Sequence, residues 1–256
     1  MFPIRDDNPT FLTPVVTWAI VALNVAAWVF LQGLGAEEPL VRSVCNLGIV
    51  PGELLGSAPP GTSFSMGRWA CVVDPEPSWV TPFTHMFLHG GWMHLIGNMW
   101  FLWVFGNNVE DSMGHVRFAV FYVLCGLAAA AAQIASTPAS PVPMVGASGA
   151  IGGVMGAYII LYPRVRVHLL VIFGFFIDRI VVPAYFMLGY WFLLQLIGGT
   201  VARSEEGGGV AFWAHAGGFA AGALLGMMFK RPALVDRHPY HGWTAPSPRR
   251  WHARRR

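Results

Sequence analysis

The sequence predicts an all-α, polytopic membrane protein with six transmembrane helices. Charged residues make up only 11% of the 256 residues, hydrophobic residues make up 55%, and the mean hydropathy is +0.52. Ordinary soluble domains carry about 25% charged residues. Several long stretches contain no Asp, Glu, Lys or Arg at all. These features exclude an ordinary cytosolic enzyme, a disordered protein and a disulfide-dense secreted scaffold, and they indicate that the lipid bilayer is the solvent.

Each predicted span is a charge-free stretch long enough to cross a bilayer, for which about 20 apolar residues suffice. These stretches are residues 8–36 (with an apolar centre at 14–34), 77–109, 118–163, 180–202 and 207–229. The stretch 118–163 is long enough for two spans, and three prolines between Thr137 and Pro143 mark the turn between them. Residues 167–177 are too few for a span and are expected to lie at the membrane interface.

The basic residues set the expected orientation. Six spans place both chain ends on one side of the membrane, and cytoplasmic loops carry an excess of Lys and Arg. With the N-terminus inside, the inner segments hold 13 basic residues and the outer loops hold three. We therefore expect an N-in, C-in protein. Its expected parts are a cytoplasmic segment (1–11), a six-span domain (12–229) with a first outer loop at about 35–80, and a basic cytoplasmic tail (230–256).

The N-terminal stretch is not expected to be a targeting signal. The first apolar stretch follows acidic Asp6 and Asp7 and lacks a small-residue cleavage site, so a retained span is expected rather than a signal or transit peptide. The tail is rich in Pro, Trp, His and Arg, and it is expected to be disordered, either solvated or bound to anionic lipid. Because the basic residues gather in this tail, the net charge of +3 does not indicate a nucleic-acid partner.

Three polar groups interrupt the apolar spans, and polar residues at membrane depth mark function by default. They are the segment with His85, His89, His94 and Asn98, the segment from Gly146 through Ser148 to Gly156, and the segment from Ala214 through His215 to Gly222. In the expected orientation each group lies near the outer end of its span. The three groups are therefore expected at one depth.

Ser148 and His215 are the expected reactive pair. The fourth span, residues 148–162, rises only about 22 Å, less than the hydrocarbon thickness of about 30 Å. Ser148 is therefore expected at a recessed helix N-terminus. His215 shares a helix face with Gly218 and Gly222, and Gly149 begins a similar small-residue stripe on the fourth span, so the two helices are expected to dock closely. A serine beside a histidine is the nucleophile and base of acyl transfer.

An acyl-transfer site also needs donors for an oxyanion. His94 and Asn98 are four residues apart and so share one helix face. We expect the Asn98 amide, a His94 ring nitrogen and the backbone N–H of Ser148 to converge there. The acid Asp178 is expected on the opposite side of the membrane, which predicts a dyad rather than a triad.

Together these motifs resemble the rhomboid intramembrane serine proteases. The resemblance rests on Gly146-Ala-Ser148-Gly149, the His94-xxx-Asn98 pair, Ala214-His215-xx-Gly218 and the Gly218-xxx-Gly222 stripe, and it covers residues 12–229. It implies that Ser148 is the nucleophile and His215 the general base, with Asn98 and His94 at the oxyanion hole. It further implies structural or water-retaining roles for His85 and His89, and a structural role for Glu110 at the cytoplasmic end of the second span. The implied substrates are single-span membrane proteins cut near the outer membrane face.

Two positions depart from the family pattern. Many members carry a Trp-Arg pair in the first loop, whereas here Trp79 is followed by Val80. Some carry a tyrosine four residues after the nucleophile that stacks on the catalytic histidine, whereas this chain has Gly152. The first departure bears on the loop conformation and the second on how the histidine is held.

The same residues also admit other interpretations. A serine between glycines is often only a packing residue, and the pattern also suits a catalytically inactive rhomboid-like binder of membrane proteins. A transporter or channel is disfavoured because no acid lies within a span. His85, His89 and His94 could suggest zinc, but no Cys, Asp or Glu joins them at that depth. We expect no metal and no other cofactor.

Two of the three cysteines are candidates for a disulfide. Cys45 and Cys71 both fall in the first outer loop, where an oxidising exterior permits a disulfide, although free thiols are the alternative. The expected partners are transmembrane substrates and membrane lipids. A bacterial plasma membrane is expected on the resemblance alone.

Overall fold

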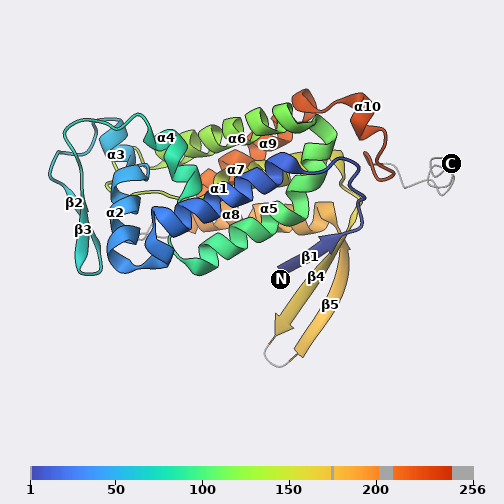
Figure 1. The fold of residues 1–256 in the computed structure, drawn as a ribbon, viewed down its shortest axis with the longest axis horizontal. Coiled ribbons are helices and arrows are strands. Elements are labelled where there is room, and N and C mark those ends of the chain that lie inside the picture. Colours follow the sequence, from blue (N-terminus) through green and yellow to red (C-terminus); the bar gives the residue numbers. More distant parts are fainter. Residues whose placement is uncertain (1, 174–175, 202–209, 244–256) are drawn as a thin grey trace.

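The computed structural model describes residues 2–173, 176–201 and 210–243, and these form a predominantly helical bundle (Figure 1). The long helices are α1 (Val15–Phe30), α5 (Trp92–Met113), α6 (His115–Ser136), α7 (Ser148–Leu161), α8 (Ala184–Val201) and α9 (Phe212–Phe229). Within the described residues, α6, α8 and α9 are long and apolar enough to cross a membrane, while α1 and α7 are shorter apolar helices. The chain is thus a membrane helix bundle.

Helix α7 lies in the middle of the bundle (Figure 1). Eleven of its 14 residues are buried, as expected for a helix that is apolar on every side. Its glycines let neighbours approach closely: a Cβ added to Gly153 would lie 2.4 Å from the Cβ of Cys125 in α6. At 14 residues, α7 is about 21 Å long, so it is shorter than the hydrocarbon core.

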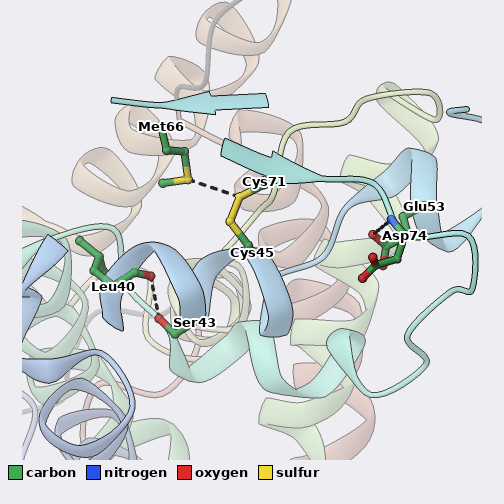
Figure 2. Close-up of a disulfide and its surroundings, with 7 residues drawn as sticks. All are labelled: Leu40, Ser43, Cys45, Glu53, Met66, Cys71 and Asp74. Atoms are coloured by element: carbon green, nitrogen blue, oxygen red, sulfur yellow. Dashed lines mark hydrogen bonds between the residues drawn. A yellow bond between two sulfur atoms is a disulfide. The ribbon is translucent and has the colours of Figure 1, made fainter. Parts of the chain in front are cut away.

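One end of the bundle is formed by the segment between α1 and α5. It contains the one-turn helix η1 (Gly33–Gly35), α2 (Glu37–Leu47), α3 (Pro51–Leu54), the hairpin β2 (Ser63–Met66) and β3 (Trp69–Val72), α4 (Thr81–Thr84) and η2 (His85–Phe87). A disulfide joins Cys45 of α2 to Cys71 of β3 (Figure 2). Asp74 N–H also donates to the Glu53 carboxylate at 3.1 Å, which ties the end of the hairpin to α3. The Cys45–Cys71 disulfide, which the sequence permits without requiring it, is therefore formed.

The opposite end differs from the all-α expectation because it carries a three-stranded antiparallel sheet. Its strands are β1 (Phe2–Asp6), β4 (Arg166–Phe173) and β5 (Phe176–Pro183), in the order β1-β4-β5. The segment 167–177, expected at the membrane interface, is therefore most of a β-hairpin that projects from the bundle (Figure 1). The distance between charged residues indicates that this segment is too short to span a membrane, but it does not indicate a strand. Val167 and Leu169 are buried on either side of half-buried His168, which is the period of a strand.

The tail also differs from expectation over its first part. Residues 230–243 are described and include α10 (Pro232–Val235), which lies at the same end as β1 (Figure 1). His238 is buried there, 3.2 Å from the Asp111 carboxylate and 3.2 Å from the Asn8 amide oxygen. These contacts hold this part of the tail against the bundle. The expected disorder of the remainder, residues 244–256, lies outside the described residues.

The positions of His85 and His89 also differ from the expectation. Both were counted within the second span, yet His85 lies in η2 and His89 in the loop before α5 begins at Trp92. Gly90 and Gly91 interrupt the helical path there. His94 and Asn98 do lie on one helix, α5, one turn apart.

Candidate active site

Ser148 and His215 meet where the N-terminal ends of two helices come together. Ser148 is the first residue of α7, and His215 lies in the first turn of α9. The Ser148 Oγ and the His215 Nε2 are 2.8 Å apart, which is a hydrogen bond, and both residues are partly buried. The arrangement provides a partly buried hydroxyl next to a base.

Glycines bring these two helices into backbone contact. A Cβ added to Gly218 would lie 2.0 Å from the Gly149 carbonyl oxygen, and one added to Gly222 would lie 1.9 Å from the Gly153 carbonyl oxygen. Real Cβ atoms do not approach so closely, so only glycine permits this crossing. The expected packing role of Gly149, Gly218 and Gly222 agrees with this geometry, which sets the distance between Ser148 and His215.

The second ring nitrogen of His215 contacts Gln195, to which the sequence motifs above assign no role. His215 Nδ1 lies 2.8 Å from the Oε1 of Gln195, which is on α8. The Trp191 indole, one turn earlier on α8, lies beside the imidazole with ring centroids 5.7 Å apart. An amide in an otherwise apolar span was the sequence signal for Gln195, since such groups hydrogen-bond between helices. The spacing of residues along the sequence does not indicate that the partner of Gln195 is His215.

His94 faces Ser148 across Gly146. A Cβ added to Gly146 would lie 2.9 Å from His94 Nε2 and 3.3 Å from Ser148 Oγ, so both groups border the same small space. The Gly90 backbone N–H donates to His94 Nδ1 at 3.2 Å. A neutral imidazole that accepts at Nδ1 carries its proton at Nε2. His94 therefore presents an N–H donor toward the space beside Ser148.

Asn98 supplies a further donor on the same face of α5. Its side chain is buried, and its Nδ2 has no hydrogen-bond partner among the described residues. The first N–H groups of a helix also have no intrahelical acceptor, and α7 begins at Ser148. The groups expected to serve an oxyanion are thus an amide, an imidazole N–H and a helix N-terminus, whose partial positive charge favours an anion.

His85 and His89 shape the loops around this space. The His85 Nδ1 bonds to the Thr81 carbonyl at 3.1 Å, and the His85 carbonyl accepts from the Gly146 N–H at 2.9 Å, which fixes the loop before Ser148. The His89 backbone is held at both its N–H and its carbonyl by the Gln32 side chain. Within the described parts of the chain, no group of three His, Cys, Asp or Glu side chains is placed to hold a metal ion.

Glu110 lies far from Ser148, near the end of α5 that adjoins β1 and α10. It is fully buried and accepts hydrogen bonds from the backbone N–H groups of Val16 and Thr17 and from the Thr17 hydroxyl. His115 lies 2.6 Å from the same carboxylate. Glu110 thereby caps the N-terminus of α1 from another helix. This contact is structural and does not reach the reactive pair.

The fold and this site define a class: a multi-helix membrane protein with a partly buried Ser–His pair between its helices. Comparison with known families is consistent with that class. Residues 76–232, more than half of the chain, match the family model for the rhomboid domain. The chain belongs to the rhomboid family.

One curated relative shows a shorter similarity. Rhomboid-like protein 11, chloroplastic, from Arabidopsis thaliana is 36% identical over 53 residues, which is 21% of this chain. The aligned part is 19% of the length of that protein. This match supports the family and says nothing about the activity of the whole chain.

Proposed function

We propose that this protein is an intramembrane serine endopeptidase that cleaves single-span membrane proteins with a Ser148–His215 dyad. Family membership makes peptide hydrolysis within the membrane the first activity to consider. The observation that carries the proposal is the 2.8 Å hydrogen bond between Ser148 Oγ and His215 Nε2 at the head of α7. This is the geometry that nucleophilic catalysis by serine requires.

In the first step the Ser148 oxygen attacks a peptide carbonyl carbon and its proton passes to His215 Nε2. The carbonyl oxygen becomes an oxyanion in the tetrahedral intermediate. Asn98 Nδ2, His94 Nε2–H and the Ser148 backbone N–H stabilise this oxyanion. Preorganised donors of this kind contribute most when water is excluded.

In the second step the intermediate collapses and the C–N bond breaks. His215 returns its proton to the leaving amine, which produces an acyl-enzyme at Ser148. Water, deprotonated by His215, then attacks the acyl carbon, and Ser148 recovers its proton as the acid product leaves. The cycle needs no cofactor.

The proposal includes six spans with both chain ends in the cytoplasm. The excess of basic residues on the inner segments supports this orientation. The Cys45–Cys71 disulfide supports it independently, because it lies at the end of the bundle where α5, α7 and α9 begin, and disulfides persist in oxidising compartments. Cleavage would therefore occur near the outer membrane face. The expected bacterial plasma membrane rests on the resemblance alone, and no comparison supports it.

A substrate helix has to unwind before its carbonyl can be attacked, since its amides are otherwise bonded internally. Two elements are candidates for the gate that admits it, the fifth span (α8) and the charge-free loop 137–147. The loop is tied to the first outer segment by backbone hydrogen bonds between Ile49 and Met144 and by the bond from Gly146 to His85. Helix α8 has exposed apolar side chains along much of its length, so we favour α8 as the element that admits substrate.

The test is cleavage of a fluorescent single-span substrate by purified protein in detergent, with Ser148→Ala and His215→Ala as variants. The proposal expects cleavage by the wild type and loss of at least about 10³-fold in both variants, with unchanged thermal unfolding. If folded wild type fails to cut several helix-destabilised substrates, the protease proposal is wrong. The inactive rhomboid-like binder would then take its place.

A further inference from the structure

We propose that Gln195 of α8 is a positioning residue, which holds His215 in the tautomer whose unprotonated Nε2 faces Ser148. The inference rests on the proposed protease function and deepens it. The dyad would then depend on a third side chain from a neighbouring helix. A carboxylate occupies this place in the serine-protease triad, whereas here the group is a neutral amide.

The hydrogen-bond directions follow from the partners in turn. Gln195 Nε2 donates to the Trp191 carbonyl at 3.2 Å, because a carbonyl only accepts. This fixes which end of the amide faces His215, and that end is Oε1, at 2.8 Å from Nδ1. A carbonyl-type oxygen has no proton to give, so Nδ1 of His215 must donate. A neutral imidazole protonated at Nδ1 has a free electron pair at Nε2, where the Ser148 hydroxyl lies.

The placement of Gln195 in α8 supports this assignment. Its neighbours Leu193 and Leu194 are 51% and 42% exposed, whereas Gln195 is 8% exposed. The amide therefore turns inward from a helix that exposes leucines immediately before it. A buried amide destabilises a protein unless both its ends are hydrogen-bonded, and both ends of Gln195 are bonded to defined partners.

Trp191 restrains the same imidazole from a second direction. Its indole lies at 35° to the His215 ring, and its Cη2 would be 3.7 Å from a Cβ added to Gly152. Gly152 is the position where some family members have a tyrosine that stacks on the histidine. Here a Cβ would lie 3.0 Å from the His215 carbonyl oxygen, and the indole from α8 lies beside the same position. Two residues of one helix, one turn apart, thus hold the ring.

The chemical consequence concerns the first proton transfer. If Nδ1 had no acceptor, the ring could carry its proton at Nε2, and in that tautomer it could not accept the proton of Ser148. Among the described residues, Asp178 cannot substitute for Gln195, because it lies in β5 at the far end of the bundle. Part of the 10²- to 10⁴-fold contribution of general-base catalysis should therefore depend on Gln195, roughly 10- to 100-fold.

The variants that test this are Gln195→Leu, which has similar volume and no acceptor, and Gln195→Glu, which keeps an oxygen toward Nδ1. The control is Leu124→Ala, which truncates an exposed leucine of α6 outside the site and the substrate entrance. Two rates are measured: substrate cleavage, and modification of Ser148 by a small fluorophosphonate, in which Oγ bonds to phosphorus as fluoride leaves. We expect Gln195→Leu to lower kcat and the labelling rate about 10- to 100-fold with unchanged KM. Gln195→Glu should restore most of the loss, and Leu124→Ala should match the wild type.

A merely structural role predicts a different pattern. Wild-type rates in Gln195→Leu, or equal losses in Gln195→Leu and Gln195→Glu that follow a lower melting temperature, would overturn the inference. Failure of the proposed function is separate: it would appear as wild-type protein that neither cleaves nor reacts with the fluorophosphonate. Nitrogen-15 NMR of histidine-labelled wild type needs no variant to fold. A protonated Nδ1 at His215 is expected, and a protonated Nε2 would contradict the proposal.

Discussion

At the scale of single residues, the two histidines of the site are held by hydrogen bonds that have only one possible direction. Gly90 N–H can only donate, so His94 Nδ1 accepts and its Nε2–H points to the space beside Gly146. Gln195 Oε1 can only accept, so His215 Nδ1 donates. Two histidines in one site thereby take opposite tautomers, one suited to donate to an oxyanion and one suited to accept a proton.

Asn98 gives the sharpest test of the oxyanion assignment. Its Nδ2 has no partner among the described residues, so Asn98→Ala removes no described hydrogen bond of that nitrogen from the resting protein. We expect kcat to fall about 10²- to 10³-fold with little change in KM, the usual effect of losing one oxyanion donor. The melting temperature should stay within a few degrees of the wild type.

Asn24 is the matched control for this experiment. It is a buried asparagine in α1 whose amide donates to the Ile20 carbonyl at 2.8 Å. Asn24→Ala should leave kcat near the wild-type value. Equal kcat in Asn98→Ala and the wild type would remove Asn98 from the mechanism.

At the scale of elements, the glycine crossing of α7 and α9 determines whether the pair can form. Gly222→Ala would place a methyl group 1.9 Å from a backbone oxygen of Gly153, and backbone cannot move aside as a flexible side chain can. The two helices must separate, so we expect about 1–3 kcal/mol of lost stability and a larger loss of cleavage.

Gly189→Ala is the control for this substitution, because nothing lies within 4 Å of the added Cβ on α8. Alanine is the better helix former, so this variant should be neutral or slightly stabilised in thermal unfolding and should cleave normally. A Gly222→Ala protein that unfolds and cleaves like the wild type would show that α7 and α9 are not in backbone contact at this position.

The attachment of α1 depends on Glu110. Glu110→Ala leaves the partly buried N–H of Val16 and the buried N–H of Thr17 without their acceptor, and each buried unsatisfied group costs about 1–3 kcal/mol. We therefore expect a loss of about 2–4 kcal/mol in chemical unfolding, and a smaller loss for Glu110→Gln, which keeps one acceptor oxygen. A change below about 0.5 kcal/mol, the size of an ordinary surface substitution, would contradict the capping role.

The elements also show how far the sequence could be interpreted. The gaps between charges located the long helices, and helical spacing grouped His94 with Asn98 and His215 with the glycine stripe. The sheet was missed because a charge-free stretch of 11 residues carries no sign of its partner strand β1, about 160 residues earlier. Gln195 was visible as a lone amide, but its bond to His215 depends on how α8 turns against α9, which spacing within one helix does not determine.

At the scale of the whole molecule, the two ends of the bundle have different chemistry. One end holds the reactive pair and the disulfide, and the other holds the buried acids Glu110 and Asp111. The sheet and α10 also lie at this other end (Figure 1). The ends are coupled through α7, which begins at Ser148 and whose Tyr158 donates a hydrogen bond to Asp6 of β1. The N-terminal strand thus attaches to the helix that carries the serine.

Asp6 makes this attachment sensitive to pH. Burial raises the pKa of Asp6 from its usual 3.8 to about 7. The folded protein then binds this proton more tightly than the unfolded chain, so the group contributes stability that is complete below about pH 4 and is lost as the pH rises to about 7. Asp6→Asn should remove this part of the decline in melting temperature between pH 4.5 and 7.5. Equal pH slopes for variant and wild type in this window would contradict the assignment.

The central claim is that Ser148 is a nucleophile activated by His215, and the most direct measurement is the site at which a fluorophosphonate attaches. Peptide mapping by mass spectrometry identifies the modified residue itself, whereas cleavage could come from a contaminating protease. The account predicts one adduct per chain, on Ser148, with labelling lost in His215→Ala. An adduct on a different residue, or a folded wild-type protein with no adduct, would contradict it.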